Sequence, residues 1–386
     1  MKKRITFFAF AAALAFCYSC SNDETVATND NAASNEISFR PLMNGVTRAA
    51  DIDAGSGTYG LQTLGFTVFA NVGSSETNYF PETVFSYNAG SYTSGATKYY
   101  WPSSGTLDFF AYQYSQSASN TVTHTALTKA FTVTPSSTAA NQTDLVVACI
   151  KGQTKTGNPS GVTLNFRHAE SKITIKLENT STTTTITVGD VVLGNVYTTG
   201  TYTFSGSTDN AETPTTTDNT VGNNNGSYLK YGDWTGQSTL GTYTQAATTT
   251  SYTSATAATA LTNSMILIPQ TLTNANAYAS SSGGAEFNGA YITVALKIQN
   301  TANSAYVVGD GETLVNAMWP LPATKWLPGH HYTYTVDLAG GGYFPTNQTD
   351  TDENLDPILA GAEIKFVTVT VDSWADGTVT PDPITM

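Results

Sequence analysis

The sequence predicts an all-β protein, and three observations carry this prediction. Aromatic residues are abundant, with 21 Tyr, 17 Phe and 5 Trp, and such flat side chains pack well on a pleated sheet, as do the many threonines. Charged residues make up only 12% of the chain, so strong helix formers are scarce. No stretch repeats its apolar residues at the 3.6-residue period of a helix. With 386 residues, the chain is long enough for two domains of roughly 150 residues each.

The first twenty residues are typical of a lipoprotein export signal. A basic segment, 2–4, precedes an apolar segment, 5–16, which is too short to span a bilayer because a spanning helix needs roughly 20 residues. We expect the signal peptide 1–19 to be removed and the Cys20 thiol to carry a lipid. Tyr18 stands where such signals usually have a small residue, so lipidation at Cys17 and an ordinary cleaved signal peptide stay as alternatives.

A polar tether and a first strand follow the signal. Residues 20–35 lack apolar pattern and predict a flexible tether. The next five residues, 36–40, alternate in polarity, which places Ile37 and Phe39 on one face of a strand. A linker rich in Gly and Ala, 44–57, comes next and contains Arg48.

The remaining strands of an N-terminal sandwich, residues 36–160, are expected at intervals of about ten residues. They are the segments 64–70, 99–102, 107–112, 131–133 and 145–150. Cys149 lies inside the last of these apolar runs and is expected to be a buried core residue, because no basic neighbour would activate its thiol. The Gly-rich segment 151–161 predicts the domain boundary.

A C-terminal sandwich, residues 161–386, is expected to contain the later strands. The first is the run 162–177, in which Ile173, Ile175 and Leu177 alternate with polar residues. The others are the segments 186–196, 202–204, 265–268, 291–298, 332–338 and 364–371. The tract 208–263 is rich in Thr and Asn and has little apolar pattern except around 228–234, so it predicts long surface loops or an excursion outside the core. The terminal strand changes phase, with Ile364 and Phe366 on one face and the three valines Val367, Val369 and Val371 on the other, which predicts a bulge or burial on both sides.

The sequence offers little to support catalysis or metal binding. The formal net charge of −13 argues against nucleic acid and anionic membrane surfaces as partners. The four His residues, among them His168 and the pair His330 and His331, have no metal-ligand spacing, so we expect structural roles and no cofactor. The acidic segment 350–356 resembles the start of a calcium loop but lacks the later Gly and Glu, which favours a solvated loop. A glycan hydrolase is the least favoured reading.

Taken together, short segments along the chain resemble the fimbrillin-like proteins of the Bacteroidales, the subunits of type V pili. The segments are 37–39, TRA at 47–49, GFTVFA at 65–70, YWP at 100–102, LDFFAY at 107–112, DLVVA at 144–148, LNFRH at 164–168, KITI at 172–175, IPQ at 268–270, WLPG at 326–329, YTY at 332–334 and VDSW at 371–374. Their order and spacing, more than any one of them, make the resemblance specific.

The resemblance implies a fold and an assembly route. The fold would be two tandem transthyretin-like β-sandwich domains. The chain would be displayed on the outer membrane as a lipoprotein, and a trypsin-like protease would cut between Arg48 and Ala49. The cut would release the lipid together with the strand of Ile37 and Phe39, and a strand from another pilin subunit would fill the vacated groove in the fimbria.

Several alternatives stay open. Without the resemblance, Arg48 is an ordinary solvated loop residue. The donated strand is either the valine strand 367–371 or the tail 375–386, which has few apolar anchors and two prolines. Alternatively, the chain is a tip adhesin that donates no strand and binds host protein or glycan through exposed aromatics such as Tyr228, Tyr231 and Trp234.

Overall fold

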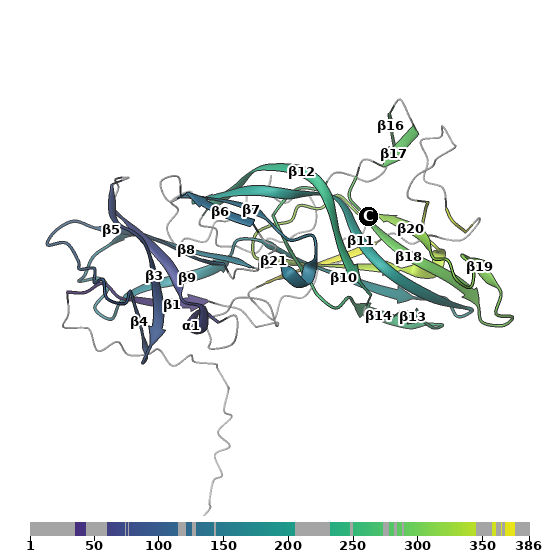
Figure 1. The fold of residues 1–386 in the computed structure, drawn as a ribbon, viewed down its shortest axis with the longest axis horizontal. Helices are drawn as coiled ribbons and strands as arrows, with labels where there is room; N and C mark the ends of the chain where they lie inside the picture. The colour runs from purple at the N-terminus through teal and green to yellow at the C-terminus, as the bar shows by residue number, and fades with distance from the viewer. Residues whose placement is uncertain are drawn as a thin grey trace, which may run out of the picture.

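The computed structural model confirms an all-β chain. It describes residues 35–43, 60–73, 75, 77–114, 121–125, 129–142, 144–204, 232–247, 250–272, 278–281, 284–287, 289–344, 357–359, 364 and 367–374. The described strands form an elongated molecule, with the early strands gathered at one end and the later strands at the other (Figure 1). Among the described residues, no helix is both long and apolar enough to cross a membrane.

A seven-stranded sheet forms the N-terminal end of the molecule. In spatial order its strands are β1 (Phe39–Met43), β9 (Val162–His168), β8 (Leu145–Gln153), β5 (Leu107–Tyr114), β2 (Phe66–Val72), β3 (Asn78–Asn88) and β4 (Ser91–Thr93). Helix α1 (Leu61–Leu64) precedes β2. The edge strands β1 and β4 approach each other, so the sheet curls around its own core.

The second sheet has eight strands and extends along the molecule. Its main path is β19 (Tyr306–Val308), β18 (Tyr291–Asn300), β11 (Thr184–Phe204), β7 (Ala130–Thr134) and β6 (Thr121–Thr125), and it is joined by β12 (Gly232–Ala246), β13 (Ser251–Tyr252) and β20 (Val315–Pro320). Strand β11 has 21 residues, which at about 3.3 Å per residue span roughly 70 Å. Together with β12 it runs along the long axis (Figure 1).

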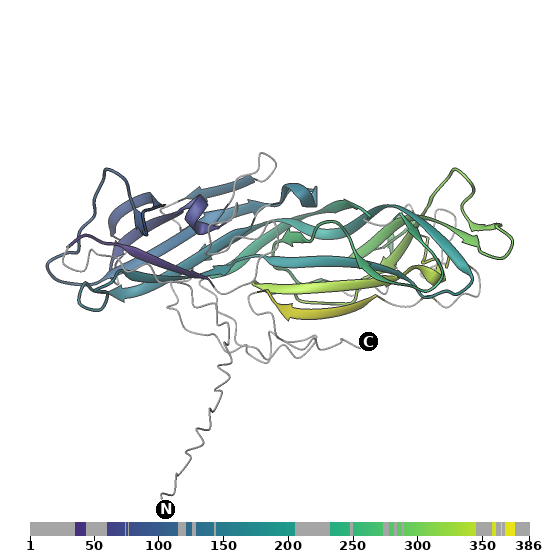
Figure 2. The same ribbon diagram turned by 90° about the horizontal axis from the view of Figure 1, so that it is seen from below.

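A five-stranded sheet completes the C-terminal end. It contains β14 (Thr256–Ala260), β10 (Ser171–Asn179), β21 (His330–Asp337) and β22 (Thr368–Ser373), with β15 (Met265–Leu267) paired to β10. Strand β22 lies at one edge of this sheet, as Figure 2 shows in yellow. The remaining elements are a two-stranded ribbon, β16 (Tyr278–Ser281) and β17 (Gly284–Phe287), and the 3₁₀ turns η3 (Ala139–Asn141) and η4 (Leu338–Gly340).

The central strands β2, β5 and β8 of the seven-stranded sheet are buried on both faces over most of their length, which explains their nearly continuous apolar residues. Within β5, Phe109 packs into the core enclosed by the curled sheet. The next residue, Phe110, packs on the opposite face against Phe131 of β7 and Phe204 at the end of β11. One end of the eight-stranded sheet therefore covers the N-terminal sheet, while its other end packs on the five-stranded sheet.

The sheets do not divide at residues 160 and 161, where the sequence predicts a boundary. Strand β9 follows that point and still pairs with β8 and β1 of the N-terminal sheet. Conversely, β7 precedes it and pairs with the end of β11. Long-range strand pairing decides this arrangement, and a Gly-rich segment marks only a local turn. The tandem transthyretin-like arrangement remains a prediction.

The tract 208–263 is also not entirely loop. In its described part, the chain forms β12, β13 and β14, and Tyr243 and Tyr252 are buried in the C-terminal core. The prediction of loops was wrong there because single aromatics, widely spaced among threonines, suffice to anchor a strand whose other face is solvated.

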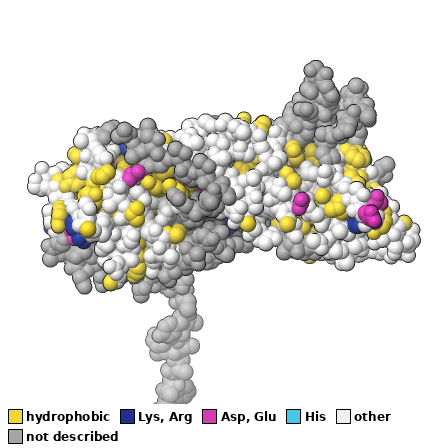
Figure 3. Space-filling view, viewed as in Figure 1, with side chains coloured by type: hydrophobic (Ala, Val, Ile, Leu, Met, Phe, Trp, Pro, Cys, Tyr) yellow, Lys and Arg dark blue, Asp and Glu magenta, His cyan; other side chains and the backbone are white. Residues whose placement is uncertain are grey.

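Uncharged side chains dominate the face shown in Figure 3, in line with the low charge content.

Candidate strand-exchange site

The segment 35–43, which includes β1, forms backbone hydrogen bonds with other parts of the chain on both of its sides. On one side, the Ile37 amide donates to the Tyr99 carbonyl at 2.8 Å, and the Trp101 amide donates to the Asn35 carbonyl at 2.9 Å. On the other side, β1 pairs in parallel with β9, from Phe39 opposite Val162 to Met43 opposite Phe166. The segment therefore closes the gap between β9 and the chain around residue 100.

The apolar side chains of this segment fill the centre of the N-terminal core. Phe39 is only 2% exposed, and its ring meets those of Phe85, Phe109 and Phe66 edge-on, at centroid distances of 4.7, 5.2 and 6.4 Å. Ile37 is buried in the same core. Because these contacts come from β2, β3 and β5, removing the segment would open a groove lined by aromatic rings.

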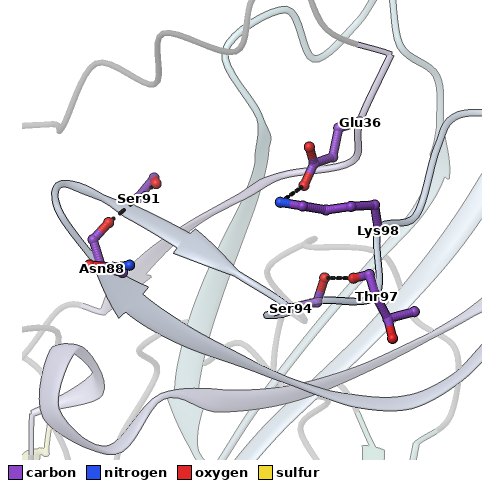
Figure 4. A network of polar contacts seen from close by, with 6 residues as sticks. All are labelled: Glu36, Asn88, Ser91, Ser94, Thr97 and Lys98. Carbon is purple, nitrogen blue, oxygen red and sulfur yellow. Dashed lines mark hydrogen bonds and ion pairs between the residues drawn. The ribbon is translucent and has the colours of Figure 1, made fainter.

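Polar contacts hold the segment less strongly than its apolar ones. Figure 4 shows the ion pair between Glu36 and Lys98, whose Oε1 and Nζ atoms lie 2.7 Å apart near the β3–β4 hairpin. The Lys98 side chain is 39% exposed, and a solvated pair of this kind contributes only about 0–1 kcal/mol. The segment is thus retained chiefly by burial and by backbone pairing.

Gly161 permits the close approach of β1. Its φ is +99°, and a Cβ built there would lie 2.9 Å from the Ser38 hydroxyl oxygen. The adjacent Val162 amide donates to the Ser38 carbonyl at 2.8 Å. Any side chain at position 161 would push against the segment that leads into β1, so this glycine allows that segment to pack close to β9.

The other predicted maturation residues, Cys20, Arg48 and Ala49, lie outside the described residues, as do Phe366, the acidic segment 350–356 and the tail 375–386. Lipidation at Cys20 and cleavage after Arg48 therefore remain predictions. Among the residues that the structure does describe, no group of three or more His, Cys, Asp or Glu is placed to bind a metal ion.

The candidate donor strand is seated in the core of its own sheet. Strand β22 pairs antiparallel with β21, and Val367, Val369 and Val371 are all at most 4% exposed in the C-terminal core. Ile364 is half-buried and packs against the same core. The structure does not bring these valines near Ile37 and Phe39, which belong to the other core.

A buried polar cluster joins the N-terminal sheet to the five-stranded sheet. The His168 Nδ1 atom lies 2.7 Å from the Asp144 carboxylate, and the Leu145 amide donates to the Glu170 carboxylate at 2.9 Å. Burial, together with the nearby Asp144 carboxyl, raises the pKa of Glu170 well above its usual range. The sequence predicted a structural role for His168, but it did not indicate that the Trp374 ring stacks on the imidazole.

Of the predicted exposed aromatics, only Trp234 is described. It borders a hollow of about 420 Å³ between the start of β12 and the connections before β16 and β21. Tyr197, Gln237 and Lys325 also line it. Half-buried Trp234 donates its indole N–H to the Ala169 carbonyl at 2.6 Å, which fixes the ring beside the hollow.

Gln270, in the IPQ segment, is a structural residue that sequence reasoning did not single out. Its side chain accepts from the Tyr197 amide at 2.7 Å and donates to the Tyr197 carbonyl at 3.0 Å. It therefore satisfies both backbone groups of one residue of β11, much as a neighbouring strand would.

One family model matches most of the chain. The model of the fimbrillin-like family matches residues 47–374. A search of curated proteins gives no match. Among solved structures, a fimbrial protein from Bacteroides vulgatus is 17% identical, with 88% of this chain and 99% of that chain covered and a TM-score of 0.48.

Two further structures come from Porphyromonas gingivalis. The tip fimbrial protein Mfa3 is 9% identical, with 88% of this chain and 100% of that chain covered and a TM-score of 0.34. The fimbrial anchor protein Mfa2 is 10% identical, with 88% and 98% covered and a TM-score of 0.30.

Proposed function

This chain belongs to the fimbrillin-like family, and from that premise we propose that it is a structural subunit of a cell-surface fimbria that exchanges its first strand for a strand of a neighbouring subunit. The chain would leave the cell as an outer-membrane lipoprotein anchored at Cys20. A trypsin-like protease would then cut after Arg48, and the lipid would depart together with β1. Other pilin subunits would be its partners.

The seat of β1 is the observation that supports this proposal best. Strand β1 is short and is the last strand at one side of its sheet, and the core contains both its Phe39 and the nearby Ile37. Once it leaves, the backbone groups of β9 and of residues 99–101 lose their partners, and the apolar groove is exposed. An incoming extended strand that restores both the hydrogen bonds and the apolar contacts would bind there by β-strand addition.

Limited proteolysis tests the maturation step. We expect trypsin to cut the lipid-free precursor after Arg48, and an Arg48→Gln variant to resist at that position. Arg40→Gln is the matched control, because Arg40 lies within β1 and donates to the Thr163 hydroxyl at 3.3 Å, so it should not alter cleavage. A precursor that stays intact at Arg48 while other sites are cut would refute the maturation route.

Polymerisation tests the exchange step. After cleavage, the chain should form a ladder on gels run without boiling, and truncation before Ile364 should abolish that ladder if β22 is the donor. An unchanged ladder from the truncated chain would exclude β22. A cleaved chain that stays monomeric at every concentration would contradict a stalk subunit.

A tip adhesin is the second candidate, and the burial of β22 favours it. Releasing this strand would expose Val367, Val369 and Val371, at roughly 1.5–3 kcal/mol for each side chain. A subunit that keeps β22 would accept a strand but donate none.

The hollow beside Trp234 would suit such an adhesin. An aromatic ring next to polar groups such as Gln237 is the usual chemistry for binding a sugar, because the ring packs on the apolar face of the sugar and the polar groups bind its hydroxyls. On a glycan array, binding should be lost in Trp234→Ala and kept in Tyr306→Ala, which removes an exposed aromatic from β19. Equal binding by both variants, or none by the wild type, would exclude this site.

A further inference from the structure

Trp374 directly follows the candidate donor strand β22 and connects it to the polar cluster between the sheets. The residue is 7% exposed. Its backbone amide donates to the Gly329 carbonyl at 2.8 Å, and the Gly329 amide in turn donates to the Glu170 carbonyl at 2.8 Å. The end of β22 is thus linked, through one residue of the loop before β21, to the segment between β9 and β10.

The side chain of Trp374 makes a second connection. Its ring stacks on the His168 imidazole with a centroid distance of 3.9 Å and an interplanar angle of 4°. The Lys172 ammonium lies 5.4 Å from the centre of the Trp374 ring, within the range of a cation–π contact. Aromatic stacking and cation–π contacts both add to the gain from burying the indole itself.

His168 is a firm support for this stack. It is the last residue of β9, in the N-terminal sheet, and its Nδ1 atom lies 2.7 Å from the carboxylate of Asp144, which is fully buried. The imidazole therefore cannot turn away without breaking a buried hydrogen bond. Trp374 consequently crosses from the five-stranded sheet to a residue that belongs to the N-terminal sheet.

We propose that Trp374 is a latch that keeps β22 in its own sheet and makes release of the strand depend on opening the contact with His168. Thr368 and Thr370 leave one face of β22 partly exposed, and the strand has a paired neighbour on only one side among the described residues. Its retention therefore rests on three buried valines, the ladder to β21 and this terminal contact. An intact latch prevents donation, and an open latch permits it.

The latch bears on the proposed function, because its consequence for assembly rests on β22 being the donor. Its effect on β22 itself does not depend on assembly. The two can be separated by measuring the seating of β22 and the formation of oligomers in the same samples.

Amide hydrogen exchange of the full-length, lipid-free chain measures the seating. In Trp374→Ala, we expect the peptide 367–374 to exchange at least about tenfold faster, because a buried indole is lost at one end of an edge strand. Trp374→Phe keeps a ring on His168 and should fall between Ala and wild type. Trp234→Ala is the matched control: it removes a tryptophan bonded to Ala169, next to His168, and should leave β22 exchange unchanged.

The exchange rates and the oligomer measurements together distinguish the latch from donation by β22. Faster exchange in Trp374→Ala, together with faster oligomer formation after cleavage at Arg48, supports the latch and donation by β22. Faster exchange without any oligomer supports the latch and overturns donation by β22. Unchanged exchange in Trp374→Ala, or equal acceleration in Trp234→Ala, overturns the latch whatever the oligomers do.

Discussion

Replacing Phe39 with Ala should weaken the packing of β1 in the N-terminal sheet more than any other single substitution in β1. The ring is 2% exposed and makes edge-to-face contacts with Phe85, Phe109 and Phe66. Burial of the side chain contributes roughly 2–3 kcal/mol, and the three aromatic contacts add about 0.5 kcal/mol or more each. The total agrees with the 3–5 kcal/mol typical of Phe→Ala in a core.

Two assays measure this loss. The first is the denaturant dependence of amide exchange in β9, whose residues pair directly with β1, because it isolates the N-terminal sheet from the rest of the chain. The second assay uses a lipid-free chain that begins at residue 21, just after the lipidation site, and measures release of the 21–48 fragment after cleavage at Arg48. Release should be roughly a hundredfold faster in the variant, since 3 kcal/mol corresponds to about that factor in a rate.

Tyr100→Ala is the matched control. Tyr100 forms a backbone bridge with Glu36, yet its side chain is 51% exposed, so we expect a loss below about 0.5 kcal/mol. A loss under about 1 kcal/mol in Phe39→Ala, or equal losses in the two variants, would refute the view that apolar burial retains β1.

Three further predictions concern the residues around the strands. Glu170→Gln should be more stable than wild type at neutral pH. Burial raises the pKa of Glu170, so the wild-type protein loses stability as the pH rises above the ordinary glutamate pKa of 4.5, and the variant does not. Thermal unfolding from pH 4 to 8 should show the difference in stability shrinking towards acid, and a constant difference would contradict this reasoning. Gly161→Ala should lower the free energy of unfolding by roughly 2–3 kcal/mol, against about 1 kcal/mol for Gly152→Ala, as measured by chemical denaturation. Both glycines have positive φ, but only Gly161 lies close to another residue, Ser38. Equal losses would argue against close packing between Gly161 and the first strand. Gln270→Ala should lose about 2–4 kcal/mol of stability, because it removes the side chain that bonds both the amide and the carbonyl of Tyr197. Gln237→Ala removes one long bond to Pro269 and should lose less than about 1 kcal/mol in the same denaturation experiment. The reverse order would contradict this structural role of Gln270.

Sequence alternation located most strands because the side chains of a strand alternate between faces. Ile37 and Phe39 share a core, and Val367, Val369 and Val371 share another, as their spacing indicates. Lipidation at Cys20 and cleavage after Arg48 follow from motif and resemblance, and they remain predictions.

Pairing between distant segments could not be predicted in the same way. Nothing near β7 indicates that it lies beside the end of β11, about 70 residues later, because pairing partners are chosen by the whole core. The parallel pairing of β1 with β9 and the stack of Trp374 on His168 likewise depend on how the sheets meet. A tryptophan after a strand predicts burial, but it does not indicate which element covers it.

Native mass spectrometry of the precursor after trypsin treatment tests the exchange of the first strand most directly. The account predicts assemblies whose masses are multiples of the 49–386 chain, with the 21–48 fragment absent from every assembly and present free in solution. Monomers that retain the 21–48 fragment after complete cleavage at Arg48 would contradict it, because β1 would then be a permanent part of the N-terminal sheet.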